Sequence, residues 1–129
     1  MNTHFRKGVE LLNAERYFEA HEVLEDVWRA APPQGKVFYQ GMVQIAVALH
    51  HYSRGNLKGA RSVLERAVRN VSDMPQGFAG IDLDGLRSQL REWSKCTQEG
   101  SAAPPWPKIQ WQVTEDNESK DPASGNQVG

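Results

Sequence analysis

The chain has 129 residues, with 15 basic and 16 acidic side chains, a formal net charge of −1 and a single cysteine. This balance excludes a polybasic protein, and one cysteine excludes both a disulfide scaffold and an all-cysteine zinc site. The first ten residues lack the apolar run of a signal peptide, and the longest apolar stretch, residues 42–49, is too short to span a bilayer. We therefore expect a soluble, cytoplasmic protein whose residues 1–99 form one domain.

Residues 1–99 are predicted to be helical almost throughout, because their apolar side chains recur with a period near 3.6 residues. Pro32 and Gly55 mark helix ends, whereas Asn56 and Asp82 are suitable N-cap residues. In chain order, the first four predicted helices are residues 3–14, 17–31, 34–54 and 57–71. A fifth helix is predicted to begin after Asp82. The fold class is therefore all-α, with about five helices.

The composition changes near Gly100. Residues 100–113 contain Trp106 and Trp111 among prolines, which favour an extended backbone. We expect this segment to lie over the helices as an extended strap; a recruitment motif for another protein is the alternative. Residues 114–129 have almost no apolar side chains and are expected to form a disordered tail.

The helical region contains an internal repeat. A shift of 40 residues aligns residues 20–25 with residues 60–65, and places Phe5 on Ile45. This register predicts two stacked helical hairpins with the fifth helix as a cap. The arrangement is similar to tetratricopeptide repeats, although those repeats are shorter, at roughly 34 residues.

One candidate site follows from helical phase. His21 and Glu25 are four residues apart on an otherwise apolar face of the second predicted helix, and Trp28 continues that stripe. The third predicted helix is apolar nearly all round, but Gln44 and His51 fall in a narrow polar stripe. Because an unpaired buried polar group costs about 1–3 kcal/mol, we predict that the two stripes meet. The result would be a polar pocket of His21, Glu25, Gln44 and His51, walled by Trp28.

The same segments carry a family resemblance. The runs FEAHEVLEDVW at residues 18–28 and QGMVQIA at residues 40–46, with RGN at 54–56, resemble the domain of unknown function family 309. The resemblance covers about residues 5–71 and implies a helical protein without an established activity. It also implies metal binding at a motif that corresponds here to His21, Glu25 and Trp28, with Gln44 and His51 matching the family's second helix. Position 50, often aromatic in such proteins, is histidine here.

Three functions remain open from the sequence. The first is binding of a small ligand or of a divalent metal such as Zn²⁺ or Fe²⁺, with His21, Glu25 and His51 as metal ligands. The second is a metal-assisted hydrolase with Glu22 or Glu25 as general base, although the His-Glu-x-x-His pattern of zinc proteases is missing. The third is a helical-repeat scaffold for a protein partner, in which the polar residues form a purely structural network.

The charge pattern predicts the class of partner. The second predicted helix is acidic and the fourth is basic, and opposite faces of this kind favour a homo-oligomer or a protein partner. A nucleic acid is less favoured, because a few cations in a nearly neutral protein usually form a solvated face. No membrane partner is expected.

Overall fold

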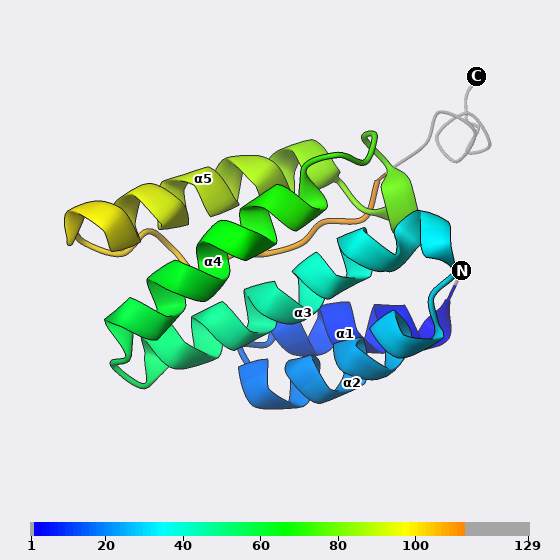
Figure 1. Cartoon of the computed structure of the whole chain (residues 1–129), viewed down its shortest axis with the longest axis horizontal. Helices are drawn as coiled ribbons and strands as arrows, with labels where there is room; N and C mark the ends of the chain where they lie inside the picture. Colours follow the sequence, from blue (N-terminus) through cyan, green and yellow to red (C-terminus); the bar gives the residue numbers. More distant parts are fainter. Residues whose placement is uncertain (1, 113–129) are drawn as a thin grey trace, which may run out of the picture.

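The structure is a computed structural model that describes residues 2–112. Five α-helices follow one another and each packs against the next (Figure 1): α1 (Thr3–Asn13), α2 (Tyr17–Ala30), α3 (Pro33–Ser53), α4 (Leu57–Val71) and α5 (Leu83–Glu99). A short 3₁₀ helix, η1 (Phe78–Gly80), precedes α5. The predicted all-α class is confirmed, and the first four predicted helices end within one residue of the observed ones. None of the described helices is long and apolar enough to cross a membrane.

The helix starts have local causes. The side chain of Asn56 accepts a hydrogen bond from the backbone N–H of Gly59, at 2.9 Å. Asp82 accepts one from the N–H of Gly85, at 3.1 Å. Each bond satisfies one of the N–H groups that a helix start leaves without a partner. Pro33 lies in the first turn of α3, where its missing N–H costs nothing.

The two hairpin turns are built alike, which supports the predicted repeat. Glu15 and Gly55, 40 residues apart, both adopt a left-handed backbone, with φ of 64° and 82°. The next residue closes each turn on the preceding helix. The N–H of Arg16 donates to the carbonyl of Leu11 at 3.0 Å, and the N–H of Asn56 donates to that of His51 at 2.9 Å. The 40-residue repeat is therefore present in the backbone conformation as well as in the amino-acid sequence.

α3 is the central helix and lies between α2 and α4. Its core side chains, Phe38, Met42, Ile45 and Leu49, are almost completely buried. Gly41 lets α4 approach closely, because a Cβ atom at this position would lie 2.7 Å from Cγ1 of Val71. This central position gives α3 two partly exposed edges, one beside α2 and one beside α4.

The predicted strap is confirmed within the described residues. After Gly100 the chain turns back along α5 toward η1 (Figure 1). The Trp106 ring stacks on Trp93, with centroids 5.1 Å apart and planes at 17°, and also contacts Tyr17 and Tyr52. Nε1 of Trp93 donates to the carbonyl oxygen of Pro105 at 2.9 Å. Because Trp106 packs against aromatic side chains of three helices, the structure favours a strap over a recruitment motif.

Polar contacts fix the strap to both ends of the helical array. The side chain of Asn13, at the end of α1, donates to the carbonyl of Ile109 and accepts from its N–H, at 2.9 and 2.7 Å. Gln89 of α5 makes the same pair of bonds with the backbone of Lys108, at 2.9 and 2.8 Å. Ile81 and Trp111 form an isolated antiparallel bridge. The strap therefore joins α1 to α5. The tail predicted at residues 114–129 lies outside the described residues.

Candidate functional site

The His21–Glu25 pair predicted on α2 is present. Nε2 of His21 lies 3.8 Å from Oε1 of Glu25, and the two side chains are 28% and 30% exposed. The other carboxylate oxygen of Glu25 lies 3.3 Å from Nη2 of Arg29. Glu25 therefore lies between an imidazole and a guanidinium. One helical turn separates each pair, so α2 alone sets this geometry.

The two predicted partners on α3 have other neighbours. Oε1 of Gln44 accepts a hydrogen bond from Nδ2 of Asn70 on α4, at 2.7 Å. Nδ1 of His51 lies 3.4 Å from Nδ2 of Asn56, in the turn before α4. These contacts turn both side chains toward α4. The structure thus does not show the predicted meeting of Gln44 and His51 with the His21–Glu25 pair.

The α2–α3 pocket contains His50 instead of His51. It has a volume of about 190 Å³ and is lined by Phe18 and His21 of α2 and by Val47 and His50 of α3. The Phe18 ring centroid lies 6.0 Å from that of His21 and 5.8 Å from that of His50. Phe18 is 55% exposed, which is unusual for so large an apolar side chain. The pocket is therefore mainly aromatic and apolar, with imidazole nitrogens as its polar groups.

Sequence reasoning missed Phe18, Val47 and His50 as pocket residues. A signal was present, because Phe18 lies next to the buried Tyr17 and one turn before Glu22, on the polar side of α2. Trp28, predicted as a wall, is not among the residues that line the pocket. It packs against the core, with Nζ of Lys36 5.9 Å from its ring centroid.

A metal site receives no support from side-chain clustering. Within residues 2–112, no group of three or more His, Cys, Asp or Glu side chains is arranged to hold a metal ion. Metal ligation by His21, Glu25 and His51 stays a prediction, as does a hydrolytic role for Glu22 or Glu25.

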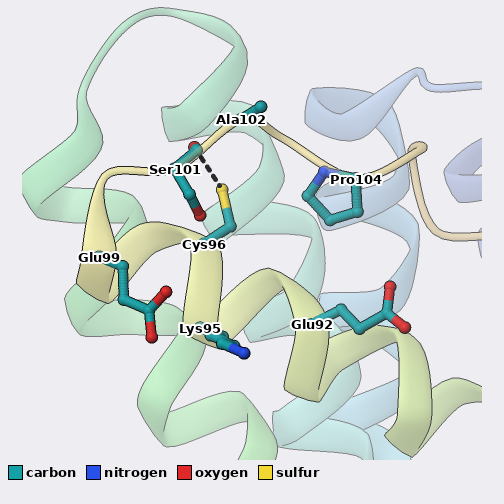
Figure 2. A pocket seen from close by; sticks show the side chains of 7 residues that line it. All are labelled: Glu92, Lys95, Cys96, Glu99, Ser101, Ala102 and Pro104. Atoms are coloured by element: carbon teal, nitrogen blue, oxygen red, sulfur yellow. Dashed lines mark hydrogen bonds between the residues drawn. The ribbon is translucent and has the colours of Figure 1, made fainter.

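A second hollow, of about 360 Å³, lies between the end of α5 and the start of the strap (Figure 2). Figure 2 shows the sulfur of Cys96 facing the backbone of Ser101; the thiol donates to that carbonyl oxygen at 3.3 Å. Cys96 is only 4% exposed. Its thiol therefore contacts the start of the strap, and the hollow offers no exposed thiol.

The chain is thus a small all-α protein of two helical hairpins and a capping helix, with a mainly aromatic and apolar pocket between α2 and α3. Residues 5–63 match the model of the family described as "Domain of unknown function (DUF309)", so the chain carries a DUF309 domain.

Two relatives are similar over more than half of the chain. An uncharacterized protein of Aquifex aeolicus (strain VF5) is 33% identical over 81 residues, which are 62% of this chain and 24% of the relative. The uncharacterized protein YpuF of Bacillus subtilis (strain 168) is 35% identical over 77 residues, 59% of this chain and 44% of the relative. The matched region thus spans about a quarter of one relative and less than half of the other.

Proposed function

We propose that the helical region is a protein-binding module whose α2–α3 pocket accepts one large side chain of a partner protein. The observation that carries this proposal is Phe18, an aromatic ring 55% exposed at the rim of an open pocket. Exposed aromatic side chains that flank a pocket are typical of the energetic centres of protein interfaces. A cytoplasmic location belongs to the same proposal, since the single cysteine is a free, buried thiol.

The size of the pocket favours a side chain over a small-molecule ligand. Pockets that bind ligands of drug size usually measure roughly 300–1,000 Å³. The present volume of about 190 Å³ is smaller than that range. A cavity of about 150 Å³ is enough for a benzene molecule. One aromatic or long aliphatic side chain therefore fits the available space.

The polar groups of the pocket would orient such a side chain. His21 and His50 bring ring nitrogens that donate or accept hydrogen bonds according to tautomer. The carboxylate of Glu25, 3.8 Å from Nε2 of His21, favours the tautomer in which this nitrogen carries the proton. Neither role requires a metal or a catalytic step.

A displayed library of random peptides, selected against the immobilised protein, tests the proposal. The selection is run at about 0.5 M salt, which screens contacts between surface charges. Selected peptides should bind the Phe18→Ala variant at least about tenfold more weakly, a loss of about 1.4 kcal/mol. Val37→Ala is the matched control, because Val37 is 53% exposed but does not line the pocket. A selection without peptides, or peptides indifferent to Phe18→Ala, would overturn the proposed function.

A further inference from the structure

We propose that the partner at this site is a second copy of the same chain, bound as a twofold dimer through the face formed by α2, α3 and α4. The inference rests on the proposed function for the place of the interface, because Phe18, the exposed aromatic ring at the rim of the α2–α3 pocket, lies within this face. It adds the identity of the partner, the orientation of the two copies and the residues that would meet.

The two outer helices of the face carry opposite charge. α2 contains four acidic residues and one arginine, whereas α4 contains four basic residues and one glutamate. In the described part of the chain, Lys58, Arg66 and Arg69 of α4 form no ion pair, and neither does Glu22 of α2. Arg61 pairs with Glu65, at 3.7 Å. The face therefore has exposed cations on one side and an exposed carboxylate on the other, each without a counter-ion among residues 2–112.

This pattern selects one twofold arrangement. α3 lies between α2 and α4. A twofold axis parallel to α3 places α2 of each copy on α4 of the other. An axis perpendicular to α3 within the interface places α2 on α2 and α4 on α4, which brings like charges together and is unfavourable. Only the parallel axis makes the face complementary to itself, as an isologous dimer requires.

The parallel axis also fixes which residues lie at the same level. Asn70 of α4 bonds to Gln44 of α3, whereas Phe18 of α2 contacts His50, six residues further along α3. At 1.5 Å per residue, this separation is about 9 Å. The chain direction of α4 is opposite to that of α3. Going from the level of Gln44 to the level of His50 therefore means going back six residues along α4, from Asn70 to about position 64. Phe18 of one copy therefore lies level with the middle of α4 in the other.

A hollow is present at that level of α4. It has a volume of about 230 Å³ and is lined by Lys58, Arg61, Ser62 and Glu65. In the dimer, Phe18 of each copy lies beside this hollow on the side toward α3, because Phe18 leans toward His50 of α3 whereas Glu65 at the hollow bonds to Gln98 of α5. The aliphatic stems of Lys58 and Arg61 can cover the ring, and their charged groups can lie over its face. Glu22, one turn beyond Phe18, then comes within reach of Arg66 and Arg69 of the second copy.

Sedimentation velocity of the full chain tests the proposal. We expect a dimer at about 0.02 M salt that dissociates at about 0.5 M, because the charges are screened. Glu22→Arg and Arg69→Glu should each raise the dissociation constant at least about tenfold, since every reversal acts twice in a twofold dimer. An equimolar mixture of the two variants should recover a dimer. One of its two symmetric contacts then joins the two reversed side chains, the other joins the two original ones, and both contacts pair opposite charges.

The control variants Glu92→Arg and Arg91→Glu make the same charge changes on exposed positions of α5 and should leave the dimer intact. A monomer at low salt, a dimer indifferent to both reversals, or a mixture that stays monomeric would overturn the proposal. Open-ended polymers in the mixture would also overturn it, because they indicate head-to-tail contacts. The peptide selection is carried out at high salt, where the dimer is expected to dissociate. A protein that is monomeric at low salt but still binds peptides through Phe18 would therefore contradict the dimer and leave the proposed function standing.

Discussion

Trp106 fastens the strap to the helices, and its replacement by alanine should destabilise the whole fold. Its ring stacks on Trp93 and contacts Tyr17 and Tyr52, each on a different helix. Truncation of a fully buried Trp or Phe to Ala costs about 3–5 kcal/mol. Trp106 is only partly buried, so the lower end applies, and we expect a loss of about 3 kcal/mol in the free energy of unfolding. Of this, about 0.5–1.5 kcal/mol belongs to the aromatic stacking itself.

Urea unfolding followed by far-ultraviolet circular dichroism measures this loss. The midpoint should fall while the slope stays unchanged, because the strap unfolds together with the helices. Phe18→Ala is the control: it also removes an aromatic ring, but one that is 55% exposed, and should cost less than about 1 kcal/mol in the monomer. A Trp106→Ala variant within about 0.5 kcal/mol of the original protein would show that the strap is not part of the cooperative unit.

Two further substitutions test single features of the fold. The hydroxyl of Tyr17 is buried and has no hydrogen-bond partner among the described residues, so Tyr17→Phe should raise the free energy of unfolding at pH 7 by about 1 kcal/mol; a loss of that size would contradict the reasoning. Burial, together with the nearby Glu15 charge, raises the pKa of Tyr17. Because the phenol ionises more easily in the unfolded chain, the free energy of unfolding should fall as the pH rises above about 10. Urea unfolding along a pH series measures this loss, which should be smaller in Tyr17→Phe. Gly55→Ala places a side chain at φ of 82° and should cost about 1 kcal/mol in the same assay, whereas an unchanged midpoint would refute the left-handed turn.

Much of the fold could be predicted because its signals are local. Asn56 and Asp82 cap their helices through atoms three residues away, and Pro32 ends the second helix through its own ring. The strap was predictable because prolines restrict the backbone and Trp106 is costly to leave in water. The pairing of Asn13 with Ile109, 96 residues apart, could not be predicted, since no local pattern encodes such a distance.

The site was predictable only where it depends on one helix. His21 and Glu25 are set by the spacing within α2, and the structure has them as a pair. The choice between His50 and His51 depends on where α2 and α4 lie around α3, because adjacent residues point about 100° apart. In the structure Gln44 bonds to Asn70 on α4, and helical phase alone does not distinguish this neighbour from the α2 stripe. The spacing of residues along one helix shows which side of that helix is polar, but not which neighbouring helix packs against this side.

The strap has a consequence for the order in which the chain folds. Contacts between successive helices join residues close in sequence, which form early and at little cost in chain entropy. The bonds between Asn13 and Ile109 close a loop of nearly the full described chain, so they can form only after the helices have come together. During synthesis, a nascent chain from which residues 100–112 have not yet emerged would leave the Trp93 ring without Trp106 stacked on it. Completion of the strap is thus the step that removes this exposed indole from contact with other chains.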